Sequence, residues 1–541
     1  KNQPPRIMSR ALTDQTQVLL AHIKSMGVLW RDWYRQLPVY QKIVTCVAAL
    51  TGSLLARFVY CKLQRKIYGY PPGPIGLPFI GSLLFFDPTT KAFRSLAFPK
   101  DENGDETRDV VMLYVFQKPY ILIGDADLFQ TFFKKEVYRD PETFVELRDY
   151  PTPFASESNL DRWSKRRQLT HAAFTSLVNS NYLDTIMSAL MQNTTFVELD
   201  KQCGGDHGSA PLYFCREDIK WLGFAFLYGV FFGINNAVPA KNDAEFQRFL
   251  ELNHEGMTGL LLAHILSLIQ NKRVRSFFQW LLDPWHGYDG MAAMMEKWKQ
   301  RRSSSLAADS DADNTYFGRM QKHVESGEVS EKQVMADAMV LVPAGLHITL
   351  SYAELALYAA AKYPQVQERV YQELRAHYAK YGAFETKRMN ELHLLRAFVH
   401  EVTRRYVQNS TGLQRNFQKD RAGPIKLGHH SIPRDATVLG AQWVILANRK
   451  FWKNPNQFCI ENFLDDHGKF QKSEYFVLFG GGRRNCVGQS LAMRELVCIM
   501  SALLHRYKWN VPADRQDDWE IPDSYWTPTV ETLPLTISRR N

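Results

Sequence analysis

One cysteine in this chain has the surroundings of a thiolate that binds a metal ion. Cys486 lies in the stretch Phe479-Gly480-Gly481-Gly482-Arg483-Arg484-Asn485-Cys486-Val487-Gly488. The consecutive glycines allow tight backbone turns that a Cβ atom would forbid, so N–H groups of the loop can point at the sulfur and tune its electron donation. Arg484 adds a positive charge next to the thiol. The alternative interpretation is a buried free thiol in a glycine-rich turn.

Two further pairs have the spacing of neighbours on one face of a helix. Trp163 and Arg167 are four positions apart, and Glu401 and Arg404 are three positions apart. Taken alone, the first pair indicates an amphipathic basic helix with a core tryptophan, in which Arg162, Lys165 and Arg166 are expected to face outward. The second pair alone indicates an ion pair of the kind that is common on exposed helices.

The order and spacing of these residues resemble the cytochrome P-450 family. The family pattern F-x-x-G-x-R-x-C-x-G is matched at every fixed position from Phe479 to Gly488, and W-x-x-x-R and E-x-x-R precede it in the expected order. The resemblance covers residues 71–541 and is closest to the eukaryotic microsomal drug- and steroid-hydroxylating branch. It implies a fold that is mainly α with a smaller β portion, with haem b between a distal helix and the proximal cysteine loop.

The resemblance also implies roles for single residues. Cys486 is expected to be the axial ligand of the haem iron, and a guanidinium such as that of Arg167 suits a haem propionate because its donors form a matching fork. Glu401 and Arg404 are expected to be a structural pair in the haem-side core. The expected cofactor-binding residues are Trp163, Arg167, Ala344, Gly345, Arg415, Phe479, Arg484, Cys486 and Gly488.

The predicted distal helix, about Val334 to Tyr363, departs from the family pattern. The family usually has Ala-Gly-x-acid-Thr-Thr where this chain has Ala344-Gly345-Leu346-His347-Ile348-Thr349. His347 takes the place of the acid and Ile348 that of the first threonine, while Thr349 lies about a third of a turn away. We therefore expect Thr349 or His347 to help deliver protons, unless water or the substrate does so.

A second departure concerns the third partner of the Glu-Arg pair. The family normally has an arginine in P-E-R-F, whereas this chain has Ile460-Glu461-Asn462-Phe463, so that the proline and the arginine are both replaced. The triad implied by the resemblance is therefore incomplete.

These residues need helices and a small sheet to position them. Strand-like runs cover Val110–Phe116 and Tyr120–Ile123, and helical patterns dominate from Leu160 onward. The seven cysteines are odd in number and scattered, which argues against a disulfide framework and favours a reducing compartment. The net charge of +10 is compatible with an anionic membrane surface or an acidic protein partner, and no nucleic-acid motif accompanies it.

The first 70 residues form the pattern of a basic and amphipathic segment with one membrane anchor. Residues 43–56 carry no charge, and the apolar character continues to Cys61. Aromatic residues precede this stretch and basic residues follow it, as in membrane anchors. We expect a single anchor at about residues 43–61, followed by a basic linker and a haem-thiolate catalytic domain over residues 71–541; an internal core helix is the alternative.

The proline-rich stretch Tyr70-Pro71-Pro72-Gly73-Pro74 resembles the hinge of microsomal family members. The resemblance therefore favours the endoplasmic reticulum membrane with a cytosolic catalytic domain. Because the first hundred residues carry few acids and begin at Lys1, a mitochondrial membrane is the alternative.

The expected function is that of a membrane-bound monooxygenase. It would insert one oxygen atom from O2 into an apolar substrate such as a lipid, sterol or xenobiotic. NADPH would supply electrons through a separate reductase or a ferredoxin-type donor, because no flavin or nicotinamide domain is recognisable in the chain. The altered distal segment keeps two alternatives open: an oxygen-independent haem-thiolate isomerase or peroxygenase, and a non-catalytic haem subunit of a membrane assembly.

Overall fold

The computed structural model describes residues 38–74, 76, 81–82, 91–101, 108–115, 118–136, 138–139, 150–192, 196, 199–200, 216–234, 238–267, 272–283, 286–305, 312–382, 384–407, 414–417, 425–512 and 535–540. The chain divides into two compact units. One contains α2, and the other begins at Gly69 and contains every element from α3 onward.

The first unit contributes one described helix, α2 (Val39–Tyr68), which has 30 residues and basic residues in its last turn. Many of its apolar side chains are exposed, for example Leu55 at 63% and Val44 at 62%. The stretch predicted as a membrane anchor lies inside this helix, and its membrane role stays a prediction. Among the described residues, only the helix Glu331–Lys362 is long and apolar enough to cross a membrane, and 67% of its most apolar stretch is buried in the fold.

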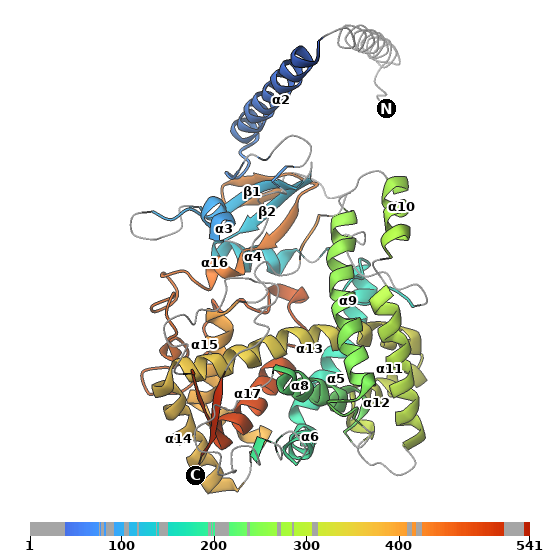
Figure 1. The fold of residues 1–541 in the computed structure, drawn as a ribbon, viewed down its shortest axis with the longest axis vertical. Coiled ribbons are helices and arrows are strands. Elements are labelled where there is room, and N and C mark those ends of the chain that lie inside the picture. The colour runs from blue at the N-terminus through green and yellow to red at the C-terminus, as the bar shows by residue number, and fades with distance from the viewer. Residues whose placement is uncertain are drawn as a thin grey trace, which may run out of the picture. The chain divides into compact units, whose positions relative to one another are not determined.

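The second unit is mainly helical, as the resemblance predicted, with a small β portion (Figure 1). Its α-helices are α3 (Lys91–Ala97), α4 (Ala126–Lys135), α5 (Leu160–Asn179), α6 (Tyr182–Met191), α8 (Arg216–Phe232), α9 (Ala244–Ser267), α10 (Lys272–Leu282), α11 (His286–Ser305), α12 (Tyr316–Glu325), α13 (Glu331–Lys362), α14 (Pro364–Tyr381), α15 (His393–Arg405), α16 (Gln442–Ile445) and α17 (Gln489–Arg506). Short 3-10 turns are η4 (Ala312–Asn314), η5 (Thr386–Glu391), η6 (Ile460–Phe463) and η7 (Gly482–Arg484).

In the described residues, the β portion comprises one three-stranded sheet and two two-stranded antiparallel sheets. The sheet has the order β1 (Val110–Val115), β2 (Lys118–Ile123), β5 (Thr437–Gly440), with β1 antiparallel and β5 parallel to β2. The two-stranded sheets pair β3 (Ile425–Leu427) with β4 (His430–Ile432), and β6 (Tyr507–Asn510) with β7 (Thr536–Arg539). Successive side chains of a strand point to opposite faces, and here both faces are buried: Met112 and Ile121 belong to the main core, while Leu113 and Leu122 join a second core with α3 and α16.

Helix α13 lies at the centre of the helical part and packs against α8, α15 and α17 (Figure 1). It begins with a capping box in which Ser330 and Gln333 satisfy each other's backbone N–H groups, and it ends before Pro364, which cannot continue it. The observed range agrees with the helix predicted over residues 334–363. Pro343 lies within α13 without interrupting it.

Candidate functional site

The cysteine loop turns back on itself against α4. The N–H of Cys486 donates to the carbonyl of Phe479 at 2.8 Å and that of Asn485 to the carbonyl of Gly482 at 3.1 Å. Gly480 and Gly482 have φ angles of +79° and +66°, which L side chains rarely adopt. A Cβ atom on Gly482 would lie 1.8 Å from the carbonyl oxygen of Phe133 in α4. The glycines predicted to allow tight turns therefore meet two separate constraints, backbone conformation and space.

Cys486 is an exposed residue at the C-terminal end of the cysteine loop. Yet desolvation by the surrounding protein raises the pKa of Cys486, while backbone hydrogen bonds from Gly488 and Gln489 and the charge of Arg167 act in the opposite direction. These donors stand where α17 begins, so the positive end of the helix dipole also faces the sulfur. This arrangement fits the prediction that loop N–H groups point at the thiol.

Four arginines from separate segments lie close together, namely Arg139, Arg167, Arg415 and Arg484, and one of them, Arg167, also lies close to the thiol. Burial and repulsion among these arginines lower the pKa of Arg484 to about 9 and that of Arg415 to about 10. The same causes hold the pKa of Arg139 well below its usual value. The carboxylate of Glu157 raises the pKa of Arg484 but also forms an ion pair with Arg162 at 3.3 Å. A cluster of this kind suits an anionic ligand with more than one negative group.

Backbone and aromatic groups hold the arginines in place. Arg484 donates to the carbonyl of Glu157 at 2.8 Å and lies 4.1 Å above the ring of Trp163. Arg167 donates to the side-chain oxygen of Asn485 at 2.5 Å, which ties α5 to the cysteine loop. Trp163 therefore supports Arg484 directly, although the sequence had paired it with Arg167.

Arg415 and Arg139 reach the cluster from outside α5 and the cysteine loop. Arg415 forms a backbone bridge with Val438 and donates to the carbonyl of Glu136 at 3.2 Å. Arg139 donates to the carbonyl of Ala155 at 2.9 Å. The sequence did not point to Arg139, because it belongs to no spacing pattern and only the fold brings it to the other arginines.

Residues 344–349 of α13, the distal segment, differ in how far they are exposed. Ala344 is exposed, Gly345, His347 and Ile348 are half-buried, and Thr349 is 3% exposed. Ala344 and Ile348 are four residues apart and so lie on one face of the helix. The proton-delivering roles given to Thr349 and His347 stay predictions.

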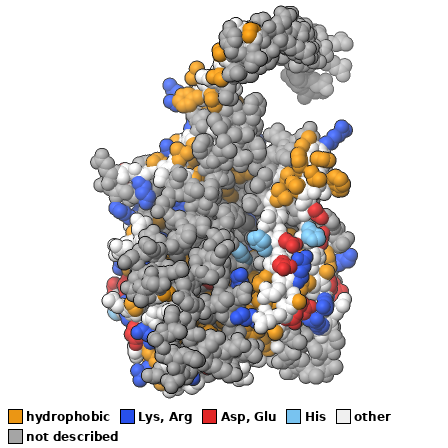
Figure 2. All heavy atoms as spheres, in the orientation of Figure 1, with side chains coloured by type: hydrophobic (Ala, Val, Ile, Leu, Met, Phe, Trp, Pro, Cys, Tyr) orange, Lys and Arg blue, Asp and Glu red, His pale blue; other side chains and the backbone are white. Residues whose placement is uncertain are grey.

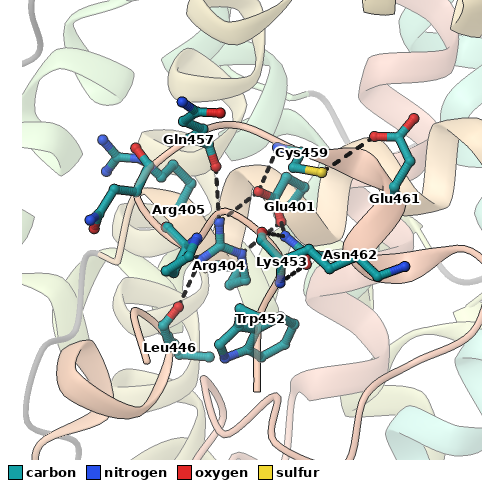
Figure 3. Close-up of polar contacts among 12 residues, drawn as sticks. Glu401, Arg404, Arg405, Leu446, Trp452, Lys453, Gln457, Cys459, Glu461 and Asn462 are labelled. Carbon is teal, nitrogen blue, oxygen red and sulfur yellow. Dashed lines mark hydrogen bonds and ion pairs between the residues drawn. The ribbon is translucent and has the colours of Figure 1, made fainter. Parts of the chain in front are cut away.

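Glu401 and Arg404 form a buried pair that organises the segment before the cysteine loop (Figure 3). Arg404 also donates to the carbonyls of Leu446 at 2.7 Å, Pro455 at 3.0 Å and Gln457 at 3.2 Å. Figure 3 shows Leu446 and Gln457 next to the guanidinium of Arg404.

Asn462 occupies the place of the missing third partner. Its side-chain nitrogen donates to Oε2 of Glu401 at 3.4 Å and to the carbonyl of Lys453 at 3.1 Å, and its oxygen accepts from the N–H of Lys453 at 2.8 Å. The N–H of Cys459 adds a bond to the other oxygen of Glu401 at 2.8 Å. An amide and a backbone donor thus take the place of the arginine expected from the family pattern.

One expectation for α5 is wrong. Arg166 was expected to face outward with Arg162 and Lys165, but it is 5% exposed and forms an ion pair with Asp337 of α13. Arg162 and Lys165 are exposed as predicted. The spacing in α5 could not reveal this difference, because the partner of Arg166 lies 171 positions away in the chain.

Comparison with known proteins decides the family. The family model described as "Cytochrome P450" matches residues 71–532. The chain belongs to the cytochrome P450 family. "Probable cytochrome P450 305a1" of Drosophila melanogaster is 26% identical over 511 residues, which are 90% of this chain and 97% of that protein. "Cytochrome P450 2C7" of Rattus norvegicus is 24% identical over 485 residues, 86% and 93% of the two chains.

A local match is closer in sequence. "Cytochrome P450 2W1" of Mus musculus is 33% identical over 178 residues, which are 33% of this chain and 35% of that protein. The family predicted from the motifs is confirmed. Membership of the cytochrome P450 family implies a haem cofactor and, in general, a monooxygenase role.

The residues near Cys486 fit the haem of a cytochrome P450. A thiol that receives backbone N–H bonds matches the thiolate ligand of the iron. The arginine cluster matches the two propionates of haem, because a guanidinium group can form paired hydrogen bonds with a carboxylate. Cys486 would ligate the iron, and Arg139, Arg167, Arg415 and Arg484 would hold the propionates.

Proposed function

We propose that the chain is a membrane-bound cytochrome P450 monooxygenase that inserts one oxygen atom from O2 into an apolar substrate. The observation that carries this proposal is the meeting of the Cys486 thiol, its two backbone donors and the arginine cluster. Haem bound through a thiolate supplies the electron-rich iron that favours cleavage of the O–O bond. The protein's own contribution is to hold, orient and enclose that group.

Two helices hold these groups in position. Helix α5 carries Trp163 and Arg167, and α17 starts directly after the cysteine loop with its N–H groups directed at the sulfur. Ala344 and Ile348 lie on one face of α13. Their apolar side chains favour an apolar substrate such as a lipid, sterol or xenobiotic. His347 is a titratable residue of the same segment and is our candidate for holding a proton, with Thr349 as the second.

The exposed basic residues around the cysteine loop support an acidic electron donor. Arg483 is exposed and donates to the hydroxyl of Ser164 at 3.2 Å, beside the exposed Lys165. Lys134 and Lys135 are exposed at the end of α4, which packs on the loop. A positive surface next to the proximal ligand suits docking of an NADPH-dependent reductase or a ferredoxin-type donor.

Two exposed apolar helices support attachment to a membrane. Helix α2 contains the stretch predicted as an anchor, and α10 exposes large apolar side chains, with Trp280 75% and Phe277 54% exposed. Figure 2 shows hydrophobic side chains gathered at α10. The exposed Arg273 precedes them, and a basic residue beside aromatic ones is typical of helices at a lipid surface. We infer the endoplasmic reticulum membrane, with a mitochondrial membrane as the alternative.

Spectroscopy of the ferrous protein with carbon monoxide tests the haem assignment. The wild-type protein should show the red-shifted Soret band of thiolate ligation, and Cys486→Ala should lose it. Cys459→Ala is the matched control, because Cys459 is a half-buried thiol in a different loop and should leave the band unchanged. A band that survives Cys486→Ala would overturn the assignment.

A second function is favoured by one observation. Ile348 shares its helical face with Ala344, whereas Thr349 is buried, so the apolar residue stands where the family usually has a hydroxyl. This arrangement suits an isomerase or peroxygenase, which needs no proton delivery to O2. Incubation with a lipid hydroperoxide, without reductase and NADPH, separates the two. Product in that incubation supports the second function, product only with reductase and NADPH supports the first, and product in neither favours a non-catalytic haem subunit.

A further inference from the structure

A buried ion pair joins α5 to α13. The side chains of Arg166 and Asp337 are 5% and 1% exposed. Nε of Arg166 donates to Oδ2 of Asp337 at 3.1 Å, and a second guanidinium nitrogen pairs with Oδ1. Arg166 also donates to the carbonyls of Thr152 at 2.6 Å and Gln333 at 3.3 Å. Oδ1 of Asp337 accepts from the N–H of Phe154 at 2.6 Å. The pair therefore fixes the backbone of residues 152–157, which we call the 152–157 segment.

The 152–157 segment also supports two arginines of the haem site. The carbonyl of Ala155 accepts from Arg139 at 2.9 Å, and the carbonyl of Glu157 accepts from Arg484 at 2.8 Å. A shift of this backbone would move both acceptors together.

We propose that Arg166 and Asp337 are positioning residues for haem binding. They fix the 152–157 segment, which in turn holds the guanidinium groups of Arg139 and Arg484 where the propionates bind. This inference rests on haem binding at the proposed site.

Apolar residues could not replace the hydrogen bonds that Arg166 and Asp337 make to the 152–157 segment. A well-packed apolar pair of similar volume can be as stable as a buried ion pair. It would, however, leave the N–H of Phe154 and the carbonyl of Thr152 without their partners, and buried groups of this kind are costly to leave unsatisfied. The ion pair therefore selects one position of the segment. Because Asp337 lies about two turns before Ala344 on α13, the same pair relates the segment to the distal helix.

Haem retention tests the proposal. Haem-loaded wild-type protein and Asp337→Asn are mixed with excess apomyoglobin, and the rate of haem transfer is followed. We expect Asp337→Asn to lose haem about tenfold faster or more, as for other residues that support a ligand set indirectly. Hydrogen exchange should speed up at the amides from Phe154 to Glu157. Arg166→Lys keeps the charge but lacks the planar fork, and it should give an intermediate rate.

Two control variants separate positioning from general stability. Glu331→Gln removes the ion pair that α13 forms with Lys299, in which Glu331 is 65% exposed, and should leave haem transfer unchanged. Leu374→Ala creates a cavity at a fully buried position of α14 and lowers stability away from the 152–157 segment. The positioning role is refuted if Asp337→Asn loses haem no faster than wild type, or no faster than Leu374→Ala of equal thermal stability. If wild-type protein shows no thiolate-ligated haem, the proposed function fails instead.

Discussion

Glu401 and Arg404 form a bidentate ion pair in which neither side chain is more than 1% exposed. Nε and a terminal nitrogen of Arg404 each lie 2.7 Å from a different oxygen of Glu401. Burial raises the pKa of Glu401 and the arginine opposes that rise. Because the same guanidinium bonds to carbonyls of residues 446–457, the pair connects α15 to the chain that leads to the cysteine loop.

Removing one partner of this pair should cost far more than removing an exposed pair. Arg404→Ala would leave the carboxylate of Glu401 buried without its arginine and three backbone carbonyls without their donor. We therefore expect a loss of about 3–5 kcal/mol in the free energy of unfolding. Arg369→Ala is the control, since Arg369 and Glu461 pair at 2.8 Å with side chains 48% and 49% exposed. It should cost about 1 kcal/mol or less in urea unfolding. Equal losses in the two variants would contradict the assigned role of Arg404.

Asn462 should stabilise the fold because its amide is a neutral donor to Glu401. Asn462→Ala removes its bonds to Glu401 and Lys453 and should cost about 1–2 kcal/mol in unfolding free energy. Asn462→Asp keeps the acceptor for the N–H of Lys453 but places a second carboxylate beside Glu401. At pH 7 the aspartate variant should therefore be less stable than the alanine variant, and the difference should shrink as acid protonates one carboxyl group. An aspartate variant that is the more stable of the two at pH 7 would argue against the contact with Glu401.

Gly482 should tolerate no side chain. Gly482→Ala needs a positive φ and brings a Cβ atom onto the carbonyl of Phe133, so we expect loss of the thiolate haem spectrum. Gly327→Ala has the same kind of backbone, with φ +72°, but no atom lies within 4 Å of its Cβ position. It should cost only about 1–2 kcal/mol for the left-handed conformation and keep the spectrum. If both variants keep the spectrum, the close contact with α4 does not shape the loop.

Local patterns allowed much of this site to be predicted. The glycines around Cys486, the helix that stops before Pro364 and the pair Glu401 and Arg404 all depend on residues close together in the chain, where spacing and backbone preference decide the structure. The family motif also identified Asn462 as a departure, although only the fold shows that its amide still bonds to Glu401.

Contacts between distant segments could not be predicted in this way. Arg166 looks like one more basic residue in α5 until Asp337 is brought beside it. Arg139 can be recognised as part of the site only because the fold brings it close to Arg415 and Arg484, which lie on other elements. In both cases burial turns an ordinary charged residue into part of the site, and a single sequence carries no periodic signal for such burial.

His400 should make the fold sensitive to acid. Burial among aromatic rings lowers the pKa of His400 to about 3, and its Nδ1 lies 2.8 Å from the carbonyl of Arg396. A lowered histidine pKa leaves full stability above the unfolded value of about 6.5, and stability is lost as the pH falls from there toward 3. Relative to His400→Gln, wild-type protein should lose about 1.4 kcal/mol per pH unit over that range. Urea unfolding between pH 7.5 and about 4.5 measures the slope, and parallel curves for the two proteins would exclude this origin.

Glu495 should destabilise the fold as the pH rises. It lies in α17, burial raises its pKa well above the usual value, and its Oε1 has no hydrogen-bond partner among the described residues. A Cβ atom on Gly223 of α8 would lie 3.6 Å from this oxygen, so the carboxyl group sits between two packed helices. The folded state keeps the proton while the unfolded chain releases it above about pH 4.5, so stability declines from there until the folded group ionises.

Glu495→Gln keeps the shape of the side chain and removes this proton linkage. Its thermal stability should exceed that of wild type at neutral pH, with an advantage that grows by about 1.4 kcal/mol per pH unit above pH 4.5. Glu251→Gln is the control, because Glu251 is 62% exposed on α9, and its difference from wild type should stay small at every pH. An advantage of Glu495→Gln that does not change with pH would mean that Glu495 is ionised in the folded protein, with a partner outside the described residues.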